Sequence, residues 1–411
     1  MSCFGYSVVS IDLSSQQLVG TLPTLLGWLS QLNYLNLSIN KLTGTLPTQL
    51  GSLSLLAYLD VRLNSFSGSL CSNLGSLSHL AHMDLSLNSL TGTLLTTQLS
   101  SLKRLVYMNL GYNKISGSIC SEVGSLPQIT ALGIYSNKLS GILPTQLGSL
   151  RQLQYLDLSA NSLNGTMPVE LSSMSQMNAL SLQDNLISGS LLTQIGLLSQ
   201  LFALNLYKNS LSGALPTQLG NLSRLEFLDL EENSFNGSLP SQLGLLTSLQ
   251  FLGLSWNSLG GALPVEFGSL TQLSYMDLQF NLFTGSLDPL GSLTQLVFMV
   301  LDNNAFNGGL ATQLGALSQL IYMSIKSNSL TGSIPSQFGS LLQLEYLDLS
   351  ENFLTGNIPS QLSVLTDLYT LVLSNNRLSG PVPQGLINLT GLSANTFSIV
   401  SALVLIIDIS F

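Results

Sequence analysis

Few residues of this chain could perform chemistry, and they are scattered. Its two histidines, His79 and His82, are three positions apart, with Asp84 as the nearest carboxylate. A metal site needs three or four such ligands held together, so we interpret both histidines as surface side chains. The sequence contains no G-x-S-x-G motif, Walker loop, kinase signature or EF-hand loop. We therefore predict a protein that is not an enzyme and that uses no cofactor or metal.

A repeat of about 24 residues organises nearly the whole chain. An asparagine marks each copy after the first, where Gln16 takes its place, and thirteen of the fifteen intervals between the sixteen markers are 24 residues. These markers, the asparagine ladder, are Asn40, Asn64, Asn88, Asn113, Asn137, Asn161, Asn185, Asn209, Asn233, Asn257, Asn281, Asn304, Asn328, Asn352 and Asn376. Such a period predicts a solenoid of stacked coils.

Each repeat combines a short strand with a tight return path. Alternating apolar residues, such as Leu35 and Leu37, precede the marker and predict a strand with one buried face. Leucines three apart, such as Leu50, Leu53 and Leu56, predict a 3₁₀-like return. The marker asparagine is expected to bond backbone groups of the adjoining coils. A glycine four positions later in every repeat predicts a close backbone approach or a positive φ.

The run L-x-x-L-x-x-L-x-L-x-x-N-x-L-[ST]-G-x-[LI]-P-x-x-L-G-x-L resembles the plant-type leucine-rich repeat of receptor-like kinases, receptor-like proteins and polygalacturonase-inhibiting proteins. The resemblance covers Val8 to Leu392. It implies an α/β solenoid, a right-handed superhelix with one long parallel sheet on its concave face. A short second sheet and 3₁₀ turns would form the return path, and the concave or lateral face would serve recognition.

We expect three segments. Residues 1–7 would be the remnant of an N-terminal cap, residues 8–392 the solenoid of sixteen units, and residues 393–411 an apolar C-terminal tail. The tail could attach the protein to a membrane or cap the last coil. One extra residue within 93–98 and one missing residue within 286–290 are interpreted as tolerated changes on the convex side.

Composition and cysteines narrow the partners and the compartment. Only 8% of residues are charged and the net charge is −9, so no basic stripe is present to bind nucleic acid. Cys71 and Cys120 stand two coils apart, beyond disulfide reach, and are interpreted as buried. The resemblance places Cys3 as the second cysteine of an N-terminal cap, with its partner upstream.

The sequence is compatible with two cellular locations. No signal peptide is present at the start as written, so the protein is either intracellular or has lost its start; we favour an extracellular or cell-surface protein. Five N-glycosylation sequons are compatible with secretion, at Asn36, Asn164, Asn221, Asn236 and Asn388.

Two columns of side chains are expected on the concave face. Six residues before the markers stand Tyr34, Tyr58, His82, Tyr107, Tyr155, Phe227, Phe251, Tyr275, Phe298, Tyr322 and Tyr346. We call the unbroken run of six from Phe227 to Tyr346 the aromatic ladder. Two positions further on, Asp or Asn recurs, as at Asp84, Asp229 and Asp277. Both columns could be a recognition surface, or a habit of the repeat in which rings stack for stability.

A candidate ligand surface stands just before the markers, where most repeats carry serine. Residues of several repeats break that habit, and we select six of them that fall in four consecutive repeats: Tyr207, Lys208, Glu231, Glu232, Trp256 and Phe280. Exposed aromatic residues mixed with charges are typical of interface centres. We predict that this patch binds a protein, peptide or glycan ligand, with a co-receptor as a further candidate partner.

Two other functions stay open. Segments such as Thr43-Gly44-Thr45 and Thr91-Gly92-Thr93 would hold hydroxyls in a flat array on the second sheet. T-x-T arrays resemble the ice-binding faces of some β-solenoid antifreeze proteins, which gives adsorption to ice or polysaccharide as the alternative. The other is a structural or adhesive surface protein.

Overall fold

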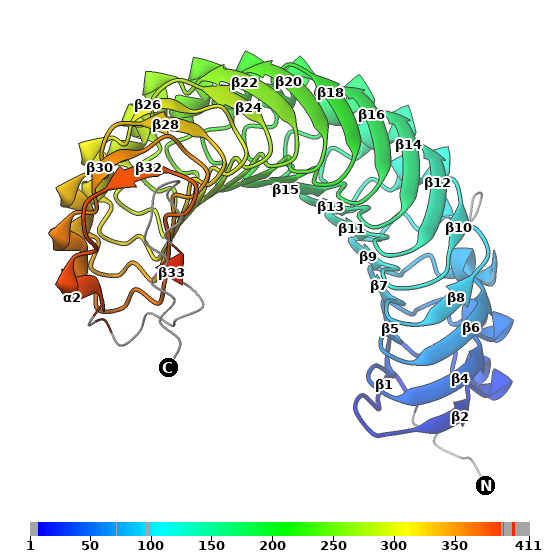
Figure 1. Ribbon diagram of the computed structural model, residues 1–411. Coiled ribbons are helices and arrows are strands. Elements are labelled where there is room, and N and C mark those ends of the chain that lie inside the picture. The colour runs from blue at the N-terminus through cyan, green and yellow to red at the C-terminus, as the bar shows by residue number, and fades with distance from the viewer. Residues whose placement is uncertain (1–6, 71, 95–98, 388, 390–396, 399–411) are drawn as a thin grey trace, which may run out of the picture. The chain divides into compact units, whose positions relative to one another are not determined.

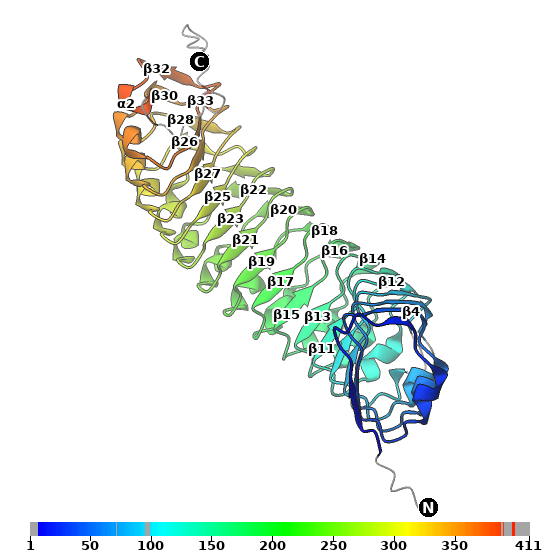
Figure 2. The same cartoon turned by 90° about the horizontal axis from the view of Figure 1, so that it is seen from below.

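The computed structural model describes residues 7–70, 72–94, 99–387, 389 and 397–398 of the 411-residue chain. The chain forms two compact units, Met1–Ser210 and Leu211–Phe411. Within each unit the chain repeats one coil, which passes through a main-sheet strand, a second-sheet strand and a 3₁₀ helix (Figures 1 and 2).

The main sheet is parallel in each unit, and each strand pairs with the strand of the next coil. In the first unit it consists of β1 (Ser10–Asp12), β3 (Tyr34–Asn36), β5 (Tyr58–Asp60), β7 (His82–Asp84), β9 (Tyr107–Asn109), β11 (Ala131–Gly133), β13 (Tyr155–Asp157), β15 (Ala179–Ser181) and β17 (Ala203–Asn205). In the second unit it consists of β19 (Phe227–Asp229), β21 (Phe251–Gly253), β23 (Tyr275–Asp277), β25 (Phe298–Val300), β27 (Tyr322–Ser324), β29 (Tyr346–Asp348), β31 (Thr370–Val372) and β33 (Phe397–Ser398).

Shorter parallel sheets form a second side of the coils. In the first unit these contain β2 (Val19–Thr21), β4 (Lys41–Thr45), β6 (Ser65–Ser69) and β8 (Ser89–Thr91), and then β10 (Ser116–Gly117), β12 (Lys138–Ile142), β14 (Ser162–Thr166) and β16 (Leu186–Ser190). β18 (Ser210–Gly213) begins at the unit boundary. The second unit continues with β20 (Ser234–Ser238), β22 (Ser258–Ala262), β24 (Leu282–Thr284), β26 (Asn307–Gly309), β28 (Ser329–Thr331), β30 (Thr355–Asn357) and β32 (Arg377–Ser379).

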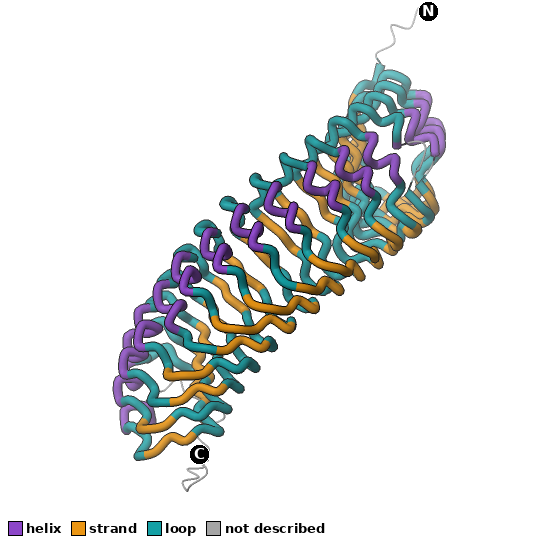
Figure 3. Tube along the Cα trace, turned by 90° about the horizontal axis from the view of Figure 1, so that it is seen from above, coloured by secondary structure: helices purple, strands orange, loops and turns teal. Residues whose placement is uncertain are grey.

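The return path of most coils is a five-residue 3₁₀ helix, and within each unit these helices stack in a row away from the main sheet (Figure 3). In the first unit they are η1 (Thr24–Trp28), η2 (Thr48–Ser52), η3 (Ser72–Ser76), η4 (Ser121–Ser125), η5 (Thr145–Ser149), η6 (Val169–Ser173) and η7 (Thr193–Leu197). In the second unit they are η8 (Thr217–Asn221), η9 (Ser241–Leu245), η10 (Val265–Ser269), η11 (Asp288–Ser292), η12 (Thr312–Ala316), η13 (Ser336–Ser340) and η14 (Ser360–Val364), followed by helix α2 (Gln384–Ile387).

The predicted fold class is confirmed. Leu35 of β3 and Leu37 just after it are buried, and the three leucines of the return path, Leu50, Leu53 and Leu56, are wholly inaccessible. Proline sets the start of many 3₁₀ helices, since a residue such as Pro47 (φ −70°) precedes η2 in extended conformation. A single coil could not bury these leucines, so stacking supplies the core.

The asparagines of the ladder bridge successive coils. In the case of Asn352, which is 4% exposed, Oδ1 accepts the Leu330 N–H of the preceding coil at 3.0 Å. Its Nδ2 donates to the Ile325 carbonyl of that coil at 2.9 Å, and to Leu349 and Ser350 of its own coil at 3.2 and 3.1 Å. A buried amide whose bonds reach two coils fixes the register between them.

Two backbone positions in each coil adopt positive φ. The sequence predicted one of them: Gly44 has φ +80°, and a Cβ there would come within 2.8 Å of the Thr21 methyl group of the preceding coil. The other was missed. The residue before each marker is also left-handed although it is not glycine, as at Leu63 (φ 52°).

The predicted changes of repeat length are only partly visible. The missing residue within 286–290 is absorbed just before η11, where Leu287 has ψ 7° in place of the extended conformation that precedes most other 3₁₀ helices. Residues 95–98, Cys3 and Cys71 lie outside the described residues, as does the tail 393–411 except for Phe397 and Ser398. Cys120 is buried, as predicted. The division into residues 1–7, 8–392 and 393–411 stays a prediction. Within the described ranges, no helix has the length and apolarity needed to cross a membrane.

Asn352→Ala should lower the free energy of unfolding by about 2–4 kcal/mol, because it leaves the Leu330 N–H without its partner and removes three further hydrogen bonds to backbone carbonyls. Asn307→Ala is the matched control, since Asn307 is exposed on β26, and its effect should stay within about 0.5 kcal/mol. Denaturant-induced unfolding followed by circular dichroism measures both. Equal stabilities for the two variants would contradict the bridging role.

Candidate functional site

The aromatic ladder lies on the main-sheet face of the second unit. Its six rings occupy the first position of strands β19 to β29, half-buried and stacked on one another. Ring centroids of neighbours are 4.4, 4.4, 5.1, 4.3 and 4.2 Å apart, and the planes lie within 16° of parallel. Because each inner ring has a neighbour on both faces, the ladder presents ring edges to solvent.

The acidic column beside the aromatic ladder has a structural role. Asp229 and Asp277 end their strands and are 8% and 5% exposed. Each Oδ1 accepts a backbone N–H two residues on, from Glu231 at 3.1 Å and from Gln279 at 3.0 Å. These bonds close the turn after the strand. At these two positions the recurring aspartate therefore serves the structure of the repeat. This was one of the two interpretations of the sequence pattern.

Glu231 fills a gap in the acidic column. Gly253 stands between Asp229 and Asp277 in the strand register, and a Cβ at Gly253 would come within 2.7 Å of Glu231 Oε1. That oxygen is buried and has no hydrogen-bond partner among the described residues. Burial, reinforced by Asp229 and Asp277, raises the pKa of Glu231 to about 8. Burial also raises the pKa of Asp229 and of Asp277 to about 6.

Trp256 and Phe280 form a separate aromatic pair at the turn after the strand. Their ring centroids are 3.9 Å apart with the planes at 20°, and Trp256 is 51% exposed. Both residues precede a marker and have positive φ, 54° and 50°. A left-handed conformation is costly for bulky side chains. Here the hydrogen bonds made by the side-chain amide of the following marker asparagine hold the backbone in that conformation.

The residues of the predicted patch belong to both compact units of the chain. Tyr207 and Lys208 belong to the first unit, where Lys208 Nζ lies 2.8 Å from Asp184 Oδ1. Glu231, Glu232, Trp256 and Phe280 belong to the second unit. Within the second unit Glu231 points to the acidic column, whereas Trp256 and Phe280 stack on each other. Their role in binding stays a prediction.

The first unit carries a shorter ring stack. Tyr34, Tyr58, His82 and Tyr107 follow one another with centroids 4.4, 4.2 and 4.4 Å apart. His82, which the sequence analysis placed in the aromatic column, is half-buried with its ring between two tyrosines, where burial lowers its pKa. Tyr155 is the exception among the aromatic positions, because its register partners are alanines, Ala131 and Ala179.

No metal site emerges from these side chains. In the part of the chain that the structure describes, no group of three or more His, Cys, Asp and Glu side chains is arranged to hold a metal ion. His79 Nδ1 instead lies 2.9 Å from the Ser54 carbonyl oxygen.

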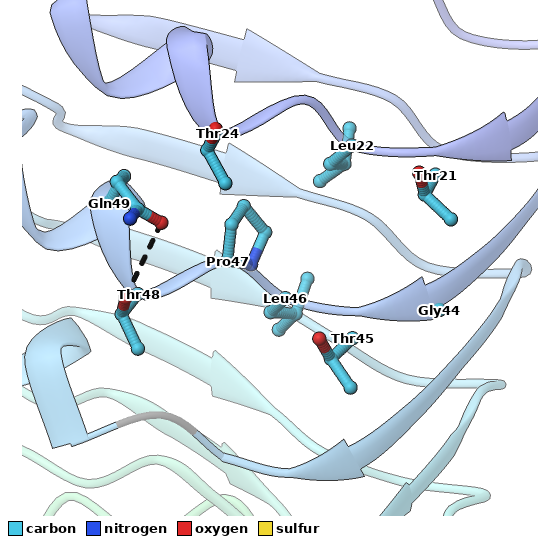
Figure 4. Close-up of a pocket in the computed structure, with 9 residues that line it drawn as sticks. All are labelled: Thr21, Leu22, Thr24, Gly44, Thr45, Leu46, Pro47, Thr48 and Gln49. Carbon is cyan, nitrogen blue, oxygen red and sulfur yellow. Dashed lines mark hydrogen bonds between the residues drawn. The ribbon is translucent and has the colours of Figure 1, made fainter.

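An open depression lies between the second sheet and the return path at the start of the first unit (Figure 4). Thr21 and Thr45 at one end and Thr24, Pro47 and Thr48 at the other line it. Such an open surface exposes hydroxyl and methyl groups but encloses no ligand-sized cavity.

The coils, the sheets and the asparagine ladder define a leucine-rich repeat solenoid, and the comparisons agree. Family models described as a leucine-rich repeat region (residues 164–310) and as leucine-rich repeats (residues 127–187, 31–53, 319–341, 343–365 and 367–389) together match more than half of the chain. The chain belongs to the leucine-rich repeat family. No curated protein sequence matches it significantly.

Three similar solved structures extend over most of the chain. A TDR receptor is 31% identical with a TM-score of 0.86, covering 94% of this chain and 71% of the receptor. The Arabidopsis receptor kinase HAESA, in complex with the peptide hormone IDA and the co-receptor SERK1, is 29% identical with a TM-score of 0.75, covering 92% and 71%. A Leptospira interrogans leucine-rich repeat protein is 30% identical with a TM-score of 0.74, covering 94% and 95%.

A fourth structure is relevant to the adsorption hypothesis. A plant ice-binding protein is 26% identical to this chain with a TM-score of 0.51, and the match covers 56% of this chain and 74% of that protein. The repeat fold is thus shared by receptors, a bacterial protein and an ice-binding protein, so the surface must decide the function.

Raising the pH should destabilise the second unit through its carboxyl groups. Asp229, Glu231 and Asp277 have pKa values in the folded protein above the ordinary 3.8 and 4.5, so the folded state binds more protons than the unfolded state. Their contribution is fully present below about pH 4 and is lost as the pH rises toward 8.

Glu231→Gln keeps the shape and removes one titrating group. The free energy of unfolding of this variant should fall less between pH 5 and pH 8 than that of the wild type, by about 1 kcal/mol after allowance for solvent screening. Urea unfolding at a series of pH values measures the difference. Parallel pH curves would show that Glu231 is not buried over Gly253 in solution.

Proposed function

We propose that this chain is a non-enzymatic, extracellular recognition module that binds a peptide or protein segment along the main-sheet face of its second unit. The observation that carries the proposal is the aromatic ladder, a half-exposed column of six stacked rings. Stacking holds the rings in fixed positions before a ligand arrives, so binding orders few side chains and costs little entropy.

The exposed ring edges favour a peptide over a glycan. A sugar ring packs on an open aromatic face, and the inner rings of the ladder have both faces covered by neighbours. Ring edges and the apolar groups between them suit an extended peptide, whose side chains and carbonyl groups can meet successive rungs. The similarity to a receptor that was solved with a peptide hormone and a co-receptor supports the same ligand class and a co-receptor here. Membrane attachment through residues 393–411 stays a prediction.

The turn after the strand provides a second contact in this proposal. The stacked pair Trp256 and Phe280 is the most exposed aromatic surface beside the ladder, and large exposed rings commonly anchor an interface. Glu232, exposed in the same unit, would add a polar contact beside it, and a role of Tyr207, Lys208 and Glu231 in binding stays a prediction.

A phage-displayed library of random dodecapeptides, selected on the purified chain, supplies a probe. Affinity of the enriched peptides, measured by biolayer interferometry, should fall at least about tenfold for Trp256→Ala and for Phe280→Ala, because each removes an aromatic anchor. Trp28→Ala is the control, since Trp28 is 79% exposed on η1 of the first unit and should have no effect. Unchanged affinity in both test variants, or an equal loss in the control, would contradict the proposed surface.

A second candidate is adsorption through the second sheet. On strands β2 to β8, Thr43, Thr45 and Thr91 are exposed, and the methyl groups of Thr21 and Thr45 pack on glycines of the next coils, which keeps their spacing regular. A flat, regular array of hydroxyl and methyl groups suits an ordered surface such as ice or a polysaccharide. The similarity to a plant ice-binding protein supports testing it.

If this candidate holds, the purified chain should show thermal hysteresis, and Thr45→Lys should remove most of it by breaking the flat array. Thr48→Lys, which changes an exposed threonine on η2, should leave it unchanged. Nanolitre osmometry measures all three proteins. Absence of hysteresis in the wild type would eliminate ice as the ligand.

A further inference from the structure

The sequons of the chain differ sharply in accessibility. Asn36 is engaged in the main sheet: its Oδ1 accepts from the Ser38 N–H at 3.1 Å and from the Ser38 hydroxyl at 2.8 Å, and its Nδ2 lies 3.4 Å from Asp12 Oδ2. Ser38, the third residue of that sequon, is 2% exposed. A glycan on Asn36 would break this network, so the folded protein has no room for it.

Asn164 has the opposite environment. It lies exposed on β14 of the second sheet, and Thr166, which completes its sequon, is also exposed. The Asn164 amide makes no hydrogen bond with any described residue, so its Nδ2 is available. Gly165 between them has φ +74°, which turns the backbone without a side chain to crowd the amide.

An apolar strip surrounds Asn164 on the same sheet. Ile142 is its register partner on β12 and Leu186 its partner on β16. These side chains are 63% and 56% exposed, and Ile142 Cγ2 lies over Gly165, within 2.7 Å of where a Cβ would stand. Two large apolar side chains are therefore left open on both sides of the Asn164 amide, where the first sugars of a glycan could cover them.

We propose that Asn164 carries an N-linked glycan that covers the strip formed by Ile142 and Leu186. In the transfer, the Asn164 Nδ2 loses one proton and bonds to the anomeric carbon of a lipid-linked oligosaccharide, while the bond from that carbon to the lipid diphosphate breaks and the diphosphate leaves with the electron pair. The first sugar rings then lie over the sheet, where their C–H faces pack against Ile142 and Leu186. This inference rests on the extracellular location that the proposed function implies.

Two other sequons are open. Asn236 is exposed on β20 and has Ser258 as its register partner, so it lacks the apolar neighbours of Asn164. Asn221 is exposed at the end of η8, and Leu245, at the same position of the stacked helix η9, is 59% exposed. Both can accept a glycan, and Asn236 serves as the matched control for Asn164. Asn164 and Asn236 both lie on second-sheet strands, so a glycan on either of them leaves the main-sheet face free for a peptide. Within the first unit, a glycan on Asn164 would leave only the hydroxyl array of β2 to β8 open for adsorption to ice or polysaccharide.

The test uses the full chain secreted from insect cells behind a fused signal peptide. Tryptic peptides, treated with an amidase that converts glycosylated Asn to Asp in heavy-oxygen water, report occupancy of each sequon by mass spectrometry. We expect Asn164 to be occupied and Asn36 to be bare. An unoccupied Asn164 in secreted, folded protein, or an occupied Asn36, would overturn the inference.

The covering role has its own readout. Asn164→Gln in the secreted protein should raise the fluorescence of a bound apolar dye about twofold, because Ile142 and Leu186 become accessible, whereas Asn236→Gln should not. Equal dye binding in both variants would overturn the covering role. Peptide binding by bacterially expressed, unglycosylated chain tests the proposed function separately, so failure of one leaves the other standing.

Discussion

The buried asparagine amide is the constraint on which this structure depends. An amide held between two coils must place its donor and acceptor groups against backbone of both, and each ladder residue does so with carbonyls of its own coil and groups of the coil before. The bonds fix the register, and they force the preceding residue into a left-handed turn even when it is tryptophan or phenylalanine. Because the register between coils is fixed, the side chains at every other repeat position are also spaced one coil apart.

Stacked columns follow from fixed register. Residues at one repeat position stand one strand spacing apart, so a repeated aromatic residue becomes a pile of parallel rings and a repeated aspartate becomes a row of closed turns. The coil thus divides its surface into sides with different chemistry. The main-sheet side exposes ring edges above a row of buried carboxyl groups. The second-sheet side exposes hydroxyl groups and the apolar strip at Asn164, and the third side is formed by the 3₁₀ helices of the return path.

Sequence pattern predicted the coil almost completely and the surface only in part. Spacing of the leucines, the asparagine and the glycine was sufficient for the sheets, the 3₁₀ return and the positive φ of residues such as Gly44, because the same burial and backbone sterics recur in every repeat. The pairing of Trp256 with Phe280 was likewise foreseeable from adjacent repeats. The location of Glu231 was not, because it depends on a missing side chain one coil away. The sequence feature that could have revealed the location of Glu231 was Gly253, which interrupts the acidic column between Asp229 and Asp277.

The central claim is that recognition takes place on ring edges that are already fixed in the free protein. Hydroxyl-radical footprinting with mass spectrometry reads the reactivity of individual aromatic side chains, with and without a saturating selected peptide. The account predicts that Phe251, Tyr275 and Phe298 lose reactivity when the peptide binds, while Trp28 on η1 is unchanged. Full reactivity of the ladder in the complex, with protection on the second sheet or the 3₁₀ helices instead, would contradict it.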